Sequence, residues 1–246
     1  MAQLEKGLPP EERVILAVDA STRDKALPLL SMARNAGAKY VKVGLEFILA
    51  LGPEEASRMV KTQGLEWVAD AKIHDIANTT GGAFSSLANL PHPPVGITMH
   101  ATAGKSSLEK AHEIGAKTGI LPIGVTVLTS IKDEEVRSTY NGISASELVM
   151  NLARKAVTAG VNGLVCSPEE LPLIRADADT KDMFAMIPGI RPAWAETGDQ
   201  SRITTPAQAI QDGADLLVIG RPIAEAPDPA AAYRAIVTEI AEALAA

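Results

Sequence analysis

The chain has 246 residues, 46% of them hydrophobic and 22% charged, with a formal net charge of -7 at pH 7. This globular composition predicts a single domain over residues 1–246, and the negative charge argues against nucleic acid or an anionic membrane surface as the main partner. We expect neither a signal peptide nor a membrane span, because no apolar run is long enough. The single cysteine, Cys166, rules out an internal disulfide and predicts a cytoplasmic protein, with this thiol buried as a small hydrophobe.

Short β-rich runs alternate with longer helical runs along the whole chain, which is the pattern of repeated βα units around a parallel sheet. Eight runs are predicted as strands: residues 14–19, 40–44, 67–72, 96–100, 120–127, 163–166, 183–188 and 216–220. Eight amphipathic runs are predicted as helices: residues 23–36, 54–63, 79–90, 106–114, 145–159, 168–176, 205–212 and 229–245. Glycines are expected to end several of these helices: Gly37, Gly64, Gly115, Gly160 and Gly213. The predicted fold class is α/β, a single (β/α)8 TIM barrel.

Polar residues gather where the predicted strands end. In chain order they are Asp19, Lys42, Asp70, Lys72, His100, Thr129, Ser130, Arg191, Gly220 and Arg221. The strand starts, such as Arg13 and Glu66, carry no comparable set of both charge signs. Because all carboxyl ends of a barrel's strands face one mouth, this asymmetry predicts a functional site there.

Two acids and a lysine end the third predicted strand, in the segment 70–75 (DAKIHD). Residues two apart in a strand face the same side, so Asp70 and Lys72 should project together, while Asp75 lies beyond the strand. A lysine held among carboxylates stays protonated, which makes Lys72 a candidate proton donor. A surface ion pair at the start of a loop is the alternative, and these residues alone leave both open.

The segment 218–223 (VIGRPI) predicts a phosphate site after the last strand. Gly220 lets a backbone N–H approach a ligand closely, and the planar guanidinium of Arg221 suits phosphate oxygens. Barrels often bind phosphate at the loops after strands seven and eight. The long loop after strand seven adds Arg191 and also Gln200, whose amide can bridge two parts of a ligand. The alternatives are an ordinary turn with an exposed arginine and a loop without ligand contact.

No metal and no cofactor are expected. The four histidines are scattered without ligand spacing, and the glycine fingerprints of dinucleotide and ATP sites are absent. Asp70 and Asp75 could hold magnesium through water. However, the ammonium of Lys42 at the neighbouring strand end would repel a cation.

Seven segments, in order along the chain, resemble the orotidine 5′-phosphate decarboxylase family, and most closely its bacterial branch. They are LAVD (16–19), VKVG (41–44), DAKIHDIANT (70–79), VTVLTS (125–130), PGIR (188–191), GDQ (198–200) and VIGRP (218–222). The resemblance covers nearly the whole chain. It implies a homodimeric, cofactor-free barrel that converts orotidine 5′-phosphate to UMP and CO2 in pyrimidine biosynthesis. The chain departs from the usual family pattern at Ala71 and Ala77, where a bulky residue and a proline usually stand.

The resemblance also implies roles for single residues. Lys72 would be the proton donor, flanked by Asp70 and by Asp75 from the partner subunit, with Lys42 completing the charged array. Asp19 and the partner's Thr79 would contact the ribose, and Thr129, or alternatively Ser130, would contact the pyrimidine. The phosphate would be bound by Arg191, Gln200, Gly220 and Arg221, and Gln200 would also contact the base. The resemblance also places Ile76 among the substrate-binding residues.

Two rival functions remain at this stage. Magnesium-dependent phosphosugar decarboxylases and hexulose-phosphate synthases look similar and share the Asp-x-Lys-x-x-Asp strand end, but tend to carry an acidic ligand where Lys42 stands. The other rival is a catalytically silent phosphate-binding barrel with a role in assembly. The intact set of Asp70, Lys72 and Asp75 counts against that second rival.

Overall fold

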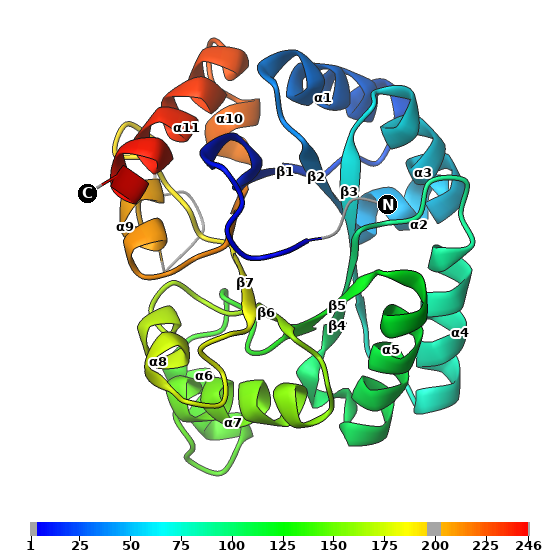
Figure 1. The fold of residues 1–246 in the computed structure, drawn as a ribbon, viewed down its shortest axis with the longest axis vertical. Helices are drawn as coiled ribbons and strands as arrows, with labels where there is room; N and C mark the ends of the chain where they lie inside the picture. The colour runs from blue at the N-terminus through cyan, green and yellow to red at the C-terminus, as the bar shows by residue number, and fades with distance from the viewer. Residues whose placement is uncertain (1–3, 196–202, 246) are drawn as a thin grey trace.

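The protein forms a closed barrel of parallel strands, seen along its axis in Figure 1. The computed structural model describes residues 4–195 and 203–245. Within these residues, neighbouring strands pair in chain order and the last pairs with the first, which confirms the predicted (β/α)8 TIM barrel. The strands are β1 (Val14–Val18), β2 (Tyr40–Gly44), β3 (Glu66–Ile73), β4 (Gly96–His100), β5 (Leu121–Val125), β6 (Gly163–Val165), β7 (Phe184–Ile187) and β8 (Leu216–Ile219).

Helices surround the barrel, and most of them lie where the hydrophobic periodicity predicts (Figure 1). These are α1 (Arg23–Ala36), α3 (Pro53–Thr62), α4 (Ala77–Ala88), α5 (Lys105–Thr118), α7 (Ala145–Thr158), α8 (Leu171–Ala176), α9 (Pro206–Gln211) and α11 (Pro229–Ala245). The sequence does not predict α2 (Leu45–Leu51), α6 (Asp133–Thr139), α10 (Arg221–Ala224) or the 3-10 turns η1 (Pro10–Glu12) and η2 (Ala101–Ala103).

One predicted helix end is wrong, because α5 continues past Gly115 to Thr118. The C-cap is Gly119, which has a φ of +75°. A Cβ on Gly115 would lie 2.6 Å from the carbonyl oxygen of Ile120, so this glycine permits close packing of the helix on the chain that enters β5. The other predicted terminating glycines all have positive φ shortly after their helices: Gly37, Gly64, Gly160 and Gly213.

The barrel wall separates two apolar cores. The larger one lies between the strands and the surrounding helices. The smaller one fills the barrel interior and consists of Leu4, Ile15, Tyr40, Val68, Val95, Ile123, Phe184, Met186 and Leu216. The N-terminal segment crosses one end of the barrel (Figure 1), and Leu4 packs into the interior cluster from there. Apolar side chains therefore fill the barrel toward its amino end, and the polar strand ends lie at the opposite mouth.

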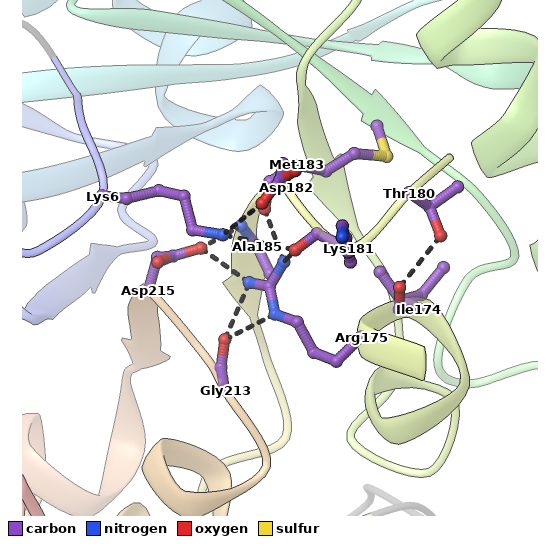
Figure 2. A network of polar contacts seen from close by, with 10 residues as sticks. All are labelled: Lys6, Ile174, Arg175, Thr180, Lys181, Asp182, Met183, Ala185, Gly213 and Asp215. Atoms are coloured by element: carbon purple, nitrogen blue, oxygen red, sulfur yellow. Dashed lines mark hydrogen bonds and ion pairs between the residues drawn. The ribbon is translucent and has the colours of Figure 1, made fainter. Parts of the chain in front are cut away.

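A buried ion pair ties α8, β7 and β8 together near the amino end of the barrel (Figure 2). Nη2 of Arg175 lies 2.7 Å from Oδ2 of Asp215, which also accepts the backbone N–H of Ala185 at 2.8 Å. The same guanidinium donates at 2.7 to 2.9 Å to three backbone carbonyls, those of Gly213, Lys181 and Met183. Since both charges are paired and hydrogen-bonded, this network is part of the scaffold.

The structure bears on two predictions, the burial of Cys166 and the lack of a membrane span. Cys166 is fully buried, and this burial raises the pKa of its thiol, so the predicted role as a small hydrophobe is confirmed. In the part of the chain that the structure describes, no helix combines the length and apolarity needed to cross a membrane.

Candidate active site

Three charged side chains meet at the carboxyl ends of β2 and β3. Nζ of Lys42 and Nζ of Lys72 each lie 2.8 Å from the same oxygen, Oδ2 of Asp70. Lys42 also lies 3.7 Å from Oδ1 of Asp19, which follows β1. Asp70 is only 7% exposed and Lys42 only 9%, so this is not the exposed ion pair that local sequence left open. The structure brings Asp70 and Lys72 together, as their spacing predicts.

The charges of this array determine its protonation states. Burial alone would raise the pKa of Asp70, but Lys42 and Lys72 outweigh burial and lower this pKa to about 2. Burial likewise opposes the charged form of Lys42, yet the carboxylates of Asp70 and Asp19 prevail and raise the pKa of the lysine. At neutral pH, Asp70 is therefore an anion held by cations, and Lys42 is one of those cations.

The backbone of Lys72 is strained. Its φ is +45°, in the left-handed region that residues with a Cβ rarely adopt. The strain coincides with a register shift between β3 and β4, which lies between Ala69 and Ile73. Such irregularities often re-aim a side chain beside a functional site. Here the re-aimed side chain belongs to the residue predicted to carry the chemistry.

A cavity of about 280 Å³ opens at the carboxyl end of the barrel. Eight of the predicted site residues line it: Asp19, Lys42, Asp70, Lys72, Thr129, Arg191, Gly220 and Arg221. A concave site of this kind, with a few convergent polar groups, suits a small anionic molecule.

Two arginines border the cavity after the neighbouring strands β7 and β8. Arg191 is only 7% exposed, and its Nη1 donates to the carbonyl of Ile190 at 2.9 Å. Backbone hydrogen bonds fix its loop, since Arg191 donates to Thr204 at 2.8 Å and Thr204 donates to Gly189 at 3.1 Å. Arg221 is the first residue of α10 and follows Gly220 directly. The arginines and the Lys72 array therefore offer two separate charged regions to one ligand.

Four predicted site residues do not line this cavity: Asp75, Ile76, Thr79 and Ser130. The first three lie exposed beyond the end of β3. Oδ1 of Asp75 accepts the backbone N–H of Ile76 at 2.7 Å, and the hydroxyl of Ser107 donates to the carbonyl of Asp75 at 2.7 Å. The turn is thus held although Ala77 stands where the family usually has proline. Gln200 lies outside the described residues.

The sequence analysis did not identify the apolar wall of the cavity. Its members are Ala17, Val125, Val127, Leu128, Val165, Met186, Pro188 and Val218. Ala17 stands near the end of β1, two residues before Asp19, so the strand period of two could have found it. Thr98, which contacts Asp70 from the neighbouring strand β4, was also missed. No local signal marks it.

The histidines and acids near the mouth do not form a metal-binding cluster among the described residues. The ring centroids of His74 and His100 lie 5.5 Å apart. Burial, with the charges of His74 and Lys72, lowers the pKa of His100, which favours the neutral imidazole at pH 7. Among the described residues, no group of three or more His, Cys, Asp or Glu could hold a metal ion. A cation at Oδ2 of Asp70 would have to displace an ammonium group.

The sequence profile of the "Orotidine 5'-phosphate decarboxylase / HUMPS family" matches residues 12–236. A protein from Streptococcus thermophilus named orotidine 5'-phosphate decarboxylase is 40% identical over 230 residues, which cover 92% of this chain and 96% of that protein. A protein of the same name from Anaeromyxobacter sp. is 42% identical over 228 residues, or 92% of this chain and 97% of that one. The crystal structure of orotidine 5'-phosphate decarboxylase from Lactobacillus acidophilus matches with a TM-score of 0.79 at 32% identity, over 93% of this chain and 99% of that chain.

Proposed function

The chain belongs to the orotidine 5'-phosphate decarboxylase / HUMPS family, and we propose that its barrel mouth decarboxylates orotidine 5'-phosphate with Lys72 as the proton donor. The activity that family membership and the relatives support is that of a carboxy-lyase, which forms UMP and CO2 in pyrimidine biosynthesis. One observation carries the mechanism. Two ammonium groups, on Lys42 and Lys72, share one oxygen of the buried Asp70 at the edge of a cavity that Arg221 also lines.

The proposed chemistry is electrostatic. When CO2 leaves, the electron pair of the broken bond stays on a ring carbon, where no adjacent group delocalises it well. The ammonium of Lys72, held 2.8 Å from Asp70, stabilises this charge and then transfers its proton to the carbon. Asp70 also repels the substrate carboxylate, and the repulsion is relieved as CO2 departs. We assign the larger share to Lys72, because its attraction grows as the negative charge develops.

The remaining contacts are proposed from the cavity lining. Asp19 would bind ribose hydroxyls, and Thr129, which lines the cavity while Ser130 does not, would contact the pyrimidine. Arg191, Gly220 and Arg221 would bind the phosphate, because they form the cationic region after β7 and β8. Gln200 remains part of the proposal as a bridge between phosphate and base.

Replacing Arg221 with alanine should mainly weaken substrate binding. We expect KM for orotidine 5'-phosphate to rise about 10- to 100-fold while kcat changes much less, since the lost contact is to a group that does not react. Steady-state kinetics measure both constants. The affinity for UMP should fall in parallel, whereas that for uridine, which lacks the phosphate, should stay the same. An equal loss for uridine would exclude a phosphate contact.

We further propose a homodimer in which each subunit completes the other's site. Asp75, Ile76 and Thr79 lie exposed at the rim and outside the cavity of their own chain. Ile76 is 70% exposed, and Leu49 of α2, which packs against β3, is 79% exposed. A second copy would cover these apolar side chains and would bring a carboxylate from Asp75 to the partner's cavity.

Mixing two inactive variants tests the shared site. Lys72→Ala and Asp75→Asn homodimers should each be inactive, but after dissociation and random re-pairing about a quarter of the wild-type activity should return. It returns because half of the dimers are then mixed, and one of the two sites in each has both native residues. The assay is turnover before and after re-pairing. Activity that stays at the sum of the unmixed samples would place both residues in one subunit's site.

No metal or cofactor has a part in the proposed reaction, since Lys72 supplies both the charge stabilisation and the proton. We propose the cytoplasm as the location, because the single thiol, Cys166, is buried and the protein needs no disulfide.

A direct assay tests the function and its rivals. The purified chain should consume orotidine 5'-phosphate, followed by the loss of its ultraviolet absorbance, and should release UMP at a rate that EDTA does not change. Loss of turnover in EDTA and its return with magnesium would support the phosphosugar decarboxylase or hexulose-phosphate synthase type. That type is disfavoured by the ammonium of Lys42 on Asp70. Binding of UMP without consumption of substrate would identify a silent barrel.

A further inference from the structure

Thr98 on β4 contacts both members of the Asp70 and Lys72 pair. Its Oγ1 accepts the backbone N–H of Lys72 at 3.0 Å and donates to Oδ1 of Asp70 at 2.9 Å. A hydroxyl has one proton to donate and lone pairs with which to accept, so both bonds form at once. Thr98 is fully buried and does not line the cavity, so its side chain does not contact a ligand bound there.

The first of these bonds supports the strained backbone of Lys72. This residue has a φ of +45° where the β3 and β4 register shifts, and its N–H donates to the threonine hydroxyl. A strained conformation persists only where surrounding contacts hold it. Without the hydroxyl, the donor would lose this partner and the constraint on Lys72 would weaken.

The second bond orients the carboxylate of Asp70. Oδ1 accepts from Thr98 while Oδ2 faces the two ammonium groups at 2.8 Å each, so the threonine holds the oxygen that the lysines leave open. Lys72 Nζ is therefore fixed from both directions, through the backbone that carries it and through the carboxylate that anchors it.

We propose that Thr98 is a positioning residue for decarboxylation, whose hydroxyl sets the place of the Lys72 ammonium at the reacting carbon. The inference rests on the proposed function of Lys72. Proton transfer and charge stabilisation both depend steeply on geometry, and a displacement of about 1 Å can cost about 100-fold in rate. The role is distinct from substrate binding, which the arginines across the mouth provide.

Thr98→Val tests the proposal, because valine keeps the shape and removes the hydroxyl. We expect kcat to fall about 10- to 100-fold, while KM and the Kd for UMP stay within about two-fold of wild type. Thr98→Ser, which keeps the hydroxyl, should restore most of kcat. Thr180→Val is the matched control: Thr180 is also fully buried, and its hydroxyl donates to the carbonyl of Ile174 at 2.9 Å in the network of Figure 2. It should lose stability but keep kcat.

The outcomes separate this inference from the proposed function. If the wild type does not consume orotidine 5'-phosphate, the proposed function fails. If the wild type is active and folded Thr98→Val has the same kcat, or Thr98→Ser is as slow as the valine variant, the positioning role is wrong. If the valine variant does not fold, Thr98→Ala replaces it: a kcat loss in alanine but not in serine supports the role, and equal kcat values refute it.

Discussion

Replacing Lys72 with alanine is expected to lower kcat for orotidine 5'-phosphate by about 10⁴-fold or more, because in the proposed mechanism its one ammonium supplies both charge stabilisation and the proton. The variant should fold, since the buried Asp70 keeps its ion pair with Lys42 at 2.8 Å and its hydrogen bond from Thr98. KM should change far less, because the proposed phosphate contacts lie elsewhere in the cavity. Single-turnover and steady-state kinetics, with urea unfolding of the same sample, measure these quantities.

A control for this variant is Lys117→Ala. The Lys117 side chain is 66% exposed. Among the described residues, its ion pair is with Glu113 alone, on the same helix, α5. Its removal should leave kcat unchanged. Near-normal turnover in folded Lys72→Ala would remove the assignment of the proton donor, whatever the effect on binding.

Replacing Arg175 with methionine is expected to lower the free energy of unfolding by about 3 to 5 kcal/mol, because it leaves a buried charge without its partner. That charge is Asp215, whose side chain is 7% exposed. Methionine also cannot donate to the carbonyls of Gly213, Lys181 and Met183 (Figure 2). Urea unfolding gives the free energy, and kcat of the folded fraction should be close to wild type because the network is remote from the mouth.

Two further variants sharpen this prediction. Arg154→Met removes an ion pair to Asp177 of similar length, 2.6 Å, in which the arginine is 49% exposed and the acid 15%, and it should cost less because water solvates this pair better than that of Arg175 and Asp215. Adding Asp215→Leu to Arg175→Met should recover part of the lost stability, because it removes the unpaired buried carboxylate. If both single arginine variants lose equal stability, or if the double variant is no better than Arg175→Met, burial of Asp215 is not the cause.

The barrel, and the mouth at which the polar residues meet, could be predicted from the sequence alone. Eight apolar runs alternate with helical ones, and hydrophobic periodicity is a local property that short segments express wherever they fold. The polar ends of those runs could then be placed at one mouth, since parallel strands in a barrel have their carboxyl ends together. The strand period of two also predicted that Asp70 and Lys72 lie on the same side.

How these groups contact one another depends on segments that are distant in sequence. The bond from Thr98 to Asp70 joins residues 28 apart, and it lies beside a register shift between β3 and β4. No local pattern encodes that shift, because register is set by packing across the closed sheet. The same holds for Gly115, which lies inside α5 and does not end it: a Cβ there would lie 2.6 Å from the carbonyl oxygen of Ile120, and only the packed structure shows this contact. Local propensity places the elements, and contacts between distant segments set the distances on which the chemistry depends.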